Sequence, residues 1–139
     1  MKDNTITIDA DIAASVEKVW DHYTKPEHIV HWNFAADTWH CPKAESDFRE
    51  GGKFSSRMEA KDGSFGFDFG GSFDEIIPLK LICYTLGDDR KVEVYFEEIN
   101  EKKSKVIIDF EPELQNPPEM QQQGWQAILD NFKKYTEVS

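Results

Sequence analysis

The sequence predicts an α+β fold in which a curved antiparallel β-sheet wraps around one long C-terminal helix, with two short helices after the first strand. Three observations support this prediction: a strand pattern opens the chain, alternating segments separated by turn residues fill its middle, and a stripe with helical spacing closes it. Consecutive hairpins pair antiparallel, so one amphipathic helix laid across the concave face can bury the sheet.

The first third of the chain predicts one strand and two short helices. Residues 5–8 alternate with period two, as a half-buried strand does. Ser15 can cap a helix that ends near Thr24, because its apolar residues recur at i, i+3, i+4 and i+7: Val16, Val19, Trp20 and Tyr23. Pro26 suits the first turn of the second helix. Residues 33–46 have no sustained period but carry several aromatic side chains, so we expect a flap lying on an apolar surface.

The rest of the chain predicts a meander of about six strands and then the long helix. Alternating segments run from Phe48 to Phe110, and turn residues separate them at 61–63, 78, 87–89 and 100–103. Gly70 and Gly71 predict a bulge or a sharp bend. The final helix follows Pro118 and runs to about Tyr135, with four residues at helical spacing directed toward the sheet: Trp125, Ile128, Leu129 and Phe132.

Length, charge and cysteine content limit the classes of function. The 139 residues suit a single domain spanning 1–139, which we expect to fold without a metal or a disulfide. The 16 basic and 27 acidic residues give a net charge of −11, which disfavours nucleic acid and anionic membranes as partners. No signal peptide or membrane span is recognisable, and Cys41 and Cys83 have no metal-ligand or redox spacing. These features predict a cytoplasmic protein with reduced thiols.

Several residues in order along nearly the whole chain resemble a known family. They are Val19-Trp20, Thr24 with Pro26-Glu27, Trp32, Gly51-Gly52-Lys53-Phe54, Asp62-Gly63, Gly70, Pro78, Gly124-Trp125 and Leu129. The sequence thereby resembles the START-like superfamily (SRPBCC, birch-pollen-allergen-like), and within it the family similar to the C-terminal domain of the activator of heat shock protein 90 ATPase. The resemblance implies a helix-grip fold with an apolar cavity between sheet and helix. It implies no shared catalytic residues and no cofactor.

The aromatic supply, ten Phe and four Trp, is large enough to line a cavity as well as fill a core. Trp32, Phe34 and Trp39 are predicted to close its mouth, and Gln121 to orient a polar group of a ligand. The predicted walls are Met58, Phe67, Phe69, Val94, Phe96, Ile108, Trp125 and Leu129. The alternative is that all of these side chains simply pack against one another as core. Gly124, inside the long helix, predicts either a close approach to sheet or ligand, or tight packing.

Other chemistry-bearing residues give weaker signals. The four histidines fall near Glu27, Asp37 and Cys41, and His28 and His31 are spaced as a feasible ligand pair on a helix. The third ligand would come from a loop that the sequence does not place, so we expect no metal. Cys41 beside His40 is expected to be a structural thiol rather than a nucleophile. Among the strand carboxylates Asp68, Glu93, Asp109 and Glu111, alternation directs Asp68 to solvent.

Three functional hypotheses follow. The first is a non-enzymatic binding domain for a small apolar or amphipathic molecule held between the C-terminal helix and the sheet. The second is an enzyme of the polyketide cyclase or hydrolase type, which needs a titratable residue that points into the same cavity. The third is a chaperone-associated domain that binds a protein partner. Fold alone does not decide among them.

Overall fold

The computed structural model describes residues 5–139, which form seven strands and three helices. In chain order the elements are β1 (Ile6–Ile12), α1 (Val16–Thr24), α2 (Pro26–Ile29), β2 (Trp39–Ser46), β3 (Lys53–Ala60), β4 (Gly66–Ile77), β5 (Leu81–Leu86), β6 (Lys91–Asn100), β7 (Lys103–Phe110) and α3 (Pro118–Val138). This is the predicted α+β helix-grip arrangement. Among the described residues, no helix combines the length and apolar character needed to cross a membrane.

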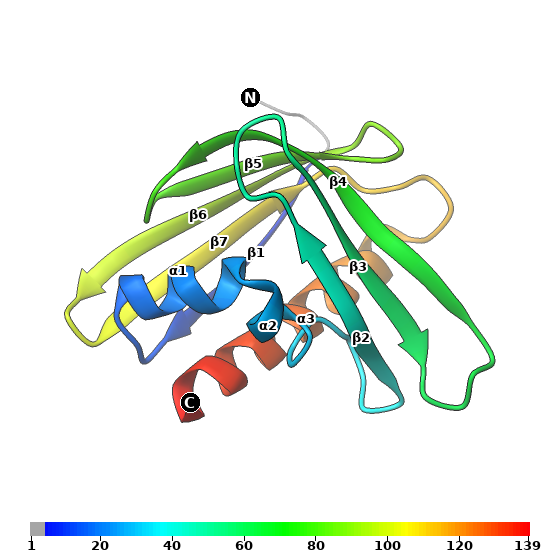
Figure 1. Ribbon diagram of the computed structural model, residues 1–139, viewed down its shortest axis with the longest axis horizontal. Coiled ribbons are helices and arrows are strands. Elements are labelled where there is room, and N and C mark those ends of the chain that lie inside the picture. The colour runs from blue at the N-terminus through cyan, green and yellow to red at the C-terminus, as the bar shows by residue number, and fades with distance from the viewer. Residues whose placement is uncertain (1–4) are drawn as a thin grey trace.

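The strands form one antiparallel sheet in the order β1-β7-β6-β5-β4-β3-β2. The five strands from β3 to β7 form the meander predicted between Phe48 and Phe110, and β2 adds a sixth, unpredicted strand at its edge. β1 pairs with β7, Ile8 lying opposite Ile108. The sheet curves around α3, which lies along its concave side (Figure 1). The fold therefore places α3 opposite the inner face of the sheet, closest to β1.

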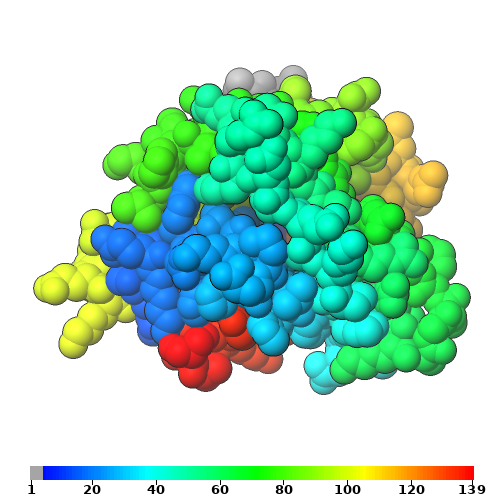
Figure 2. Space-filling view, viewed as in Figure 1, coloured from blue at the N-terminus to red at the C-terminus, as the bar shows by residue number. Residues whose placement is uncertain are grey.

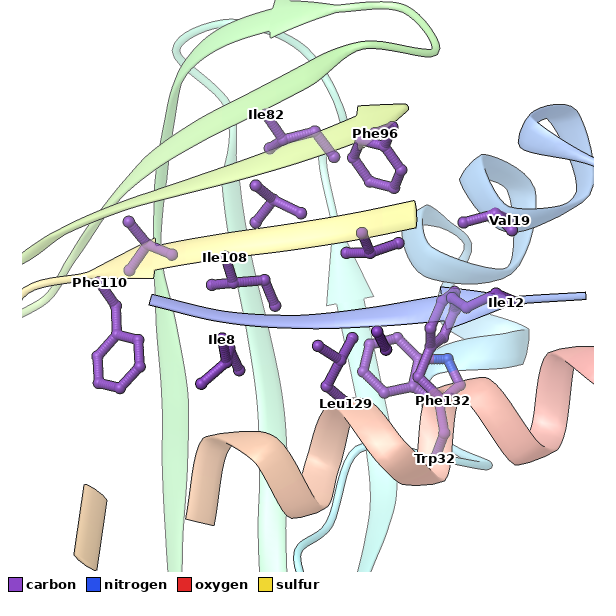
Figure 3. Packing of buried hydrophobic residues seen from close by; sticks show 14 of the residues in the cluster. Ile8, Ile12, Val19, Trp32, Ile82, Phe96, Ile108, Phe110, Leu129 and Phe132 are labelled. Carbon is purple, nitrogen blue, oxygen red and sulfur yellow. The ribbon is translucent and has the colours of Figure 1, made fainter. Parts of the chain in front are cut away.

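The core lies between α3 and the half of the sheet formed by β1, β7 and β6. Leu129 and Phe132 project from α3 toward these strands (Figure 3) and are 2% and 0% exposed. Nearer the start of the helix, the indole of Trp125 stacks on Phe110 with a centroid distance of 4.0 Å and an interplanar angle of 7°. The predicted apolar stripe of the helix does face the sheet.

A capping residue and a proline set the bounds of the two short helices. The backbone N–H of Lys18 donates to the hydroxyl of Ser15, which caps α1 as predicted. α1 ends at Thr24 because Lys25, the residue before Pro26, is extended. Pro26 then opens α2 at a position where no backbone N–H is needed. The sharp turn at Lys25 brings the end of α1 against α2.

One local prediction is wrong, and one of the two alternatives given for Gly70 and Gly71, the bulge, is also wrong. Residues 39–46 are not part of a flap but form β2, an edge strand that pairs with β3, with a register shift between His40 and Lys43. The shift and Pro42 interrupt the alternation, which an edge position tolerates. Gly70 and Gly71 lie inside β4 without a bulge, since its register shift falls between Phe73 and Glu75. Glycine is needed there because added Cβ atoms would lie 2.4 Å from the Phe54 carbonyl oxygen and 2.1 Å from that of Thr85.

Candidate functional site

The candidate site is a cavity of about 320 Å³ between α3 and the half of the sheet formed by β3, β4 and β5. This half diverges from the helix, so side chains of the two layers do not fill the space between them. The cavity walls are mainly apolar and come from three parts of the fold. The sheet supplies Phe54, Met58, Phe69, Phe73, Ile82 and Ile108; α3 supplies Trp125, Ile128 and Leu129; the α1–α2 segment, taken as α1, α2 and the turn up to Asn33, supplies Tyr23, Ile29 and Trp32.

One end of the cavity reaches the surface between the α1–α2 segment and β2. Figure 2 shows a recess where the blue helical segment meets the blue-green β2–β3 region. Thr24, Asn33, Glu45 and Ser46 line this end. The Ser46 hydroxyl is buried and has no hydrogen-bond partner within residues 5–139. Because an unsatisfied buried hydroxyl is costly, Ser46 marks a position suited to a polar group of a ligand.

Two tyrosines add polar groups to the apolar walls. Tyr23 and Tyr84 both line the cavity, and neither hydroxyl hydrogen-bonds to another group in the described part of the chain. Burial raises the pKa of Tyr23, and burial with the neighbouring Tyr23 raises the pKa of Tyr84, while Arg90 opposes the rise. Both phenols are therefore protonated at neutral pH. They are hydrogen-bond donors available to an acceptor on a bound molecule.

The opposite end of the cavity is polar and is closed by the loop that precedes α3. Gln121 lines this end as predicted, but its amide is fully used by the loop. Its Oε1 accepts from the Glu113 N–H at 2.9 Å, and its Nε2 donates to the carbonyl oxygens of Glu113 at 3.0 Å and Asn116 at 2.8 Å. Gln121 thus links the loop to the helix. The amide group that we predicted to orient a ligand is hydrogen-bonded to this loop instead.

Eight of the twelve predicted site residues line the cavity. They are Trp32, Met58, Phe67, Phe69, Ile108, Gln121, Trp125 and Leu129. The other four are not among its lining residues. Val94 and Phe96 are buried on β6, where the Trp20 ring of α1 packs on Phe96 at 4.9 Å and fills the space in front of it.

Phe34 and Trp39 do not form the predicted cover. Phe34 lies in the loop before β2, where its carbonyl oxygen accepts a hydrogen bond from the Asn131 amide of α3. Trp39 opens β2 and packs near Phe65 and Phe67, each with a centroid distance of 6.0 Å. Because residues from 39 onward belong to the sheet, the aromatic side chains of this segment are held by strand pairing and are not free to fold over the cavity.

Little in the sequence indicated which polar residues line the cavity. Tyr23 belongs to the apolar stripe of α1 and Tyr84 to the alternation of β5, so periodicity places both side chains inside without distinguishing a ring in the core from a ring at a cavity. Arg90, Glu113 and Ser46 lie in turns or at strand ends. No periodic signal exists for such positions, and only the three-dimensional arrangement brings them to the cavity.

The carboxylates that reach the cavity are engaged elsewhere. Glu45 is exposed and lies 3.4 Å from the Lys43 ammonium. Glu113 accepts from the N–H groups of Gln115 and Asn116, and the Asn116 bond lowers the pKa of its carboxyl. Asp68 points to solvent as predicted and lies 3.5 Å from Arg57.

Cys41 is a buried residue of β2 that does not line the cavity, and its Sγ lies 3.5 Å from the Lys43 carbonyl oxygen. Burial raises the pKa of this thiol, so it stays protonated at neutral pH. The neighbouring His40 ring is directed to Glu59, at 3.7 Å. The arrangement is that of a structural thiol.

Gly124 does not have either of the roles predicted for it. A Cβ atom built at this position meets no atom within 4 Å, and Gly124 is not a lining residue. It makes no close approach to the sheet or to the cavity, and it is not a point of tight packing. The cavity owes its space to the divergence of the sheet from α3.

Comparisons with known proteins agree with this architecture. A protein from Aeromonas hydrophila, described as AHSA1-like, has 39% sequence identity and a TM-score of 0.90 over 96% of this chain and 92% of its own. A protein from Cytophaga hutchinsonii has 46% identity and a TM-score of 0.83, with coverage of 97% and 93%. A protein from Chromobacterium violaceum, at 22% identity and a TM-score of 0.82 over 96% and 98%, shares the fold.

No curated protein matches the chain significantly. The family model described as "Activator of Hsp90 ATPase homolog 1-like protein" matches residues 13–137, which include α1, α2, the six strands from β2 to β7 and all but the last residue of α3, and leave out β1. The chain belongs to this family.

Proposed function

We propose that the protein binds a small apolar or amphipathic molecule in the cavity between α3 and the sheet. The observation that carries this proposal is a space of about 320 Å³ with mainly apolar walls, among them two buried tyrosines, and with a Ser46 hydroxyl that has no hydrogen-bond partner within residues 5–139. Small-molecule sites commonly have this character. A core that had only to be stable would close such a space, because unfilled volume costs stability.

The dimensions and donors of the cavity limit the ligand. Its volume corresponds to about ten water molecules at roughly 30 Å³ each, which suits a molecule of one to three rings or a short chain. The protonated hydroxyls of Tyr23 and Tyr84 favour a ligand with a hydrogen-bond acceptor such as a carbonyl or carboxylate. The aromatic rings of Trp125 and Phe69, which meet edge to face with centroids 6.0 Å apart, both line the cavity and favour aromatic ligands.

The proposal is for binding rather than catalysis. An enzyme of the cyclase or hydrolase type needs an acid or base aimed at the ligand. The cavity carboxylates Glu45 and Glu113 are held by other protein groups, and the tyrosine pKa values are raised rather than brought toward neutrality. These observations favour a site that holds its ligand without changing it.

The test is a thermal-shift screen of fatty acids, flavonoids and polyketide-like aromatic compounds. A compound that binds the folded state at one hundred times its Kd adds about 2.7 kcal/mol of stability and raises the Tm accordingly. Ile128→Trp places a larger ring against the cavity from α3 and should weaken or abolish the shift. Gln122→Trp is the matched control, because Gln122 lies on the same helix but is exposed and does not line the cavity.

The tyrosine hydroxyls have their own test. Tyr84→Phe removes only a donor and should weaken an acceptor-bearing ligand by about 3- to 10-fold, the value of one hydrogen bond. Tyr95→Phe is the control, because its hydroxyl donates to Glu93 outside the cavity. Binding by the wild type that neither Ile128→Trp nor Tyr84→Phe weakens would place the ligand elsewhere and contradict the proposal.

A protein-binding role, as in the chaperone-associated hypothesis, is the second candidate. One observation favours it: Trp39, Phe65 and Phe67 form an aromatic trio with centroid distances of 6.0 to 6.2 Å, and Phe65 and Phe67 are 63% and 42% exposed. The test is the ATPase rate of an Hsp90-type chaperone with and without this protein. Stimulation that Phe65→Ser removes would favour this role, and an unchanged rate would leave the cavity as the functional site.

A further inference from the structure

We propose that Asp21, His22 and His28 form a binding site for a divalent transition-metal ion, and that Zn²⁺ is the ion that fits its ligands. The site lies outside the cavity lining, where the end of α1 meets α2. One ligand atom from each of the three residues lies within 4.8 Å of the other two. Two imidazoles and one carboxylate, with a position left for water, are a known ligand set for Zn²⁺.

The distance between two of the ligands already suits coordination. Nε2 of His28 lies 3.6 Å from a carboxylate oxygen of Asp21. Two ligand atoms placed about 2.0 Å from a tetrahedral Zn²⁺ are about 3.3 Å apart. The gap therefore needs to close by only a few tenths of an ångström for both atoms to bind one ion.

A hydrogen bond from α3 orients the imidazole of His28. Its Nδ1 lies 2.6 Å from the hydroxyl of Tyr135, while its Nε2 is directed toward Asp21. A metal-binding histidine commonly uses its other ring nitrogen in such a bond, which fixes both the tautomer and the direction of the ring. Tyr135 accordingly acts as a positioning residue that leaves the Nε2 lone pair of His28 facing the proposed ion.

His22 provides independent evidence for the proposed metal site. Its residue is 7% exposed, and its buried Nδ1 has no hydrogen-bond partner within residues 5–139. Buried polar atoms are nearly always satisfied, so this unsatisfied ring needs an explanation. Burial also lowers the pKa of His22, which favours the neutral form that binds metals.

Coordination requires one change in the site. The His22 and His28 rings stack with centroids 4.0 Å apart and 23° between their planes, whereas an ion lies close to the plane of each imidazole that binds it. One ring must therefore turn. Tyr135 holds His28, so the unsatisfied His22 is the ring that turns. Metal binding should consequently break the stack, which proton NMR of the two rings can follow.

A lysine competes with the ion for the carboxylate. The Lys25 ammonium lies 2.7 Å from the second carboxylate oxygen of Asp21, and this contact is the main reason that the pKa of Asp21 is lowered. The lysine keeps the ligand ionised but repels a cation. Both side chains are substantially exposed, so Lys25→Met removes the repulsion without disturbing the core.

The experiment is calorimetric titration of tag-free protein with Zn²⁺ at neutral pH. We expect one ion per chain, and a loss of about 100-fold or more in affinity for Asp21→Asn and His28→Gln. Tyr135→Phe keeps the ring and should weaken binding by about 10- to 100-fold, and Lys25→Met should strengthen it. His31→Asn is the matched control, because His31 stacks on Tyr135 at 5.4 Å but is not one of the three ligands.

Circular dichroism of each variant establishes that it is folded. If His28→Gln is not folded, the Zn²⁺ affinities of Asp21→Asn and Tyr135→Phe test the proposal. Asp21→Asn changes a partly exposed side chain, and Tyr135→Phe removes only a hydroxyl. Absence of Zn²⁺ binding to the wild type would overturn the proposal. Equal losses for His31→Asn and Asp21→Asn would overturn it as well, because binding would then be spread over the histidines rather than built at this cluster.

Discussion

Replacing Gly124 by alanine should stabilise the protein. Gly124 lies in the interior of α3, and a Cβ atom there meets nothing within 4 Å, so the added methyl group brings neither a clash nor a packing contact. What remains is the helix preference, which makes glycine about 0.8–1.0 kcal/mol less favourable than alanine. We expect the free energy of unfolding to rise by about 0.5–1 kcal/mol and the Tm by about 2–3 °C.

Urea denaturation with circular dichroism measures this change, provided that the m-value is the same in both proteins. Gly63→Ala is the matched control: its Cβ also meets nothing within 4 Å, but its φ of +78° disfavours any side chain. That variant should lose about 1 kcal/mol. Destabilisation by Gly124→Ala would refute the reasoning, because it would mean that the helix lies closer to its neighbours than the structure has it. Ligand affinity should not change in either variant.

Three further predictions concern the core, pH and the buried thiol. Leu129→Ala should cost about 2–5 kcal/mol in urea denaturation, because the side chain is 2% exposed, and a cost below 1 kcal/mol would contradict its place between helix and sheet. Contacts with Lys133 and the Ala13 N–H lower the pKa of the Glu137 carboxyl. The stability that these contacts contribute to the fold is fully present above the pKa of this carboxyl in the unfolded chain, and it is lost as pH falls through its pKa in the folded protein. The stability difference between wild type and Glu137→Gln should therefore shrink in acid, and a constant difference would argue against these contacts. Cys41 should alkylate far more slowly in the folded protein than in urea, as mass spectrometry can follow, and equal rates would contradict its burial.

Periodicity predicted those helices and strands whose apolar side chains face the core in an unbroken pattern. The stripe from Trp125 to Phe132 gave α3, and the alternation around Val106 and Ile108 gave β7, since a regular backbone and one buried face leave a regular pattern. β2 escaped prediction because the register shift and Pro42 break its alternation. Its position at the sheet edge, which makes the interruption tolerable, is a property of the whole fold and leaves no local signal.

The cavity could be predicted only in part for a similar reason. Strand alternation places the side chains of Ile108 and Val94 on the same inner face of the sheet, so it does not distinguish a core position from a cavity position. In the fold, α1 packs over β6 and leaves the space in front of β3, β4 and β5 open. Helical spacing likewise suggested pairing His28 with His31. The turn at Lys25 instead brings His22 of α1 against His28, a contact between two elements that no single period describes.

The most direct test of the account is an NMR titration with a compound that raises the Tm. The account predicts ligand-to-protein nuclear Overhauser effects to Ile108, Tyr84 and Trp125, which line the cavity from two strands and from α3. Effects confined to the exposed ring of Phe65 and the half-buried ring of Trp39, with the resonances of those three lining residues unchanged, would show that the molecule binds the outer surface and would contradict the proposed function.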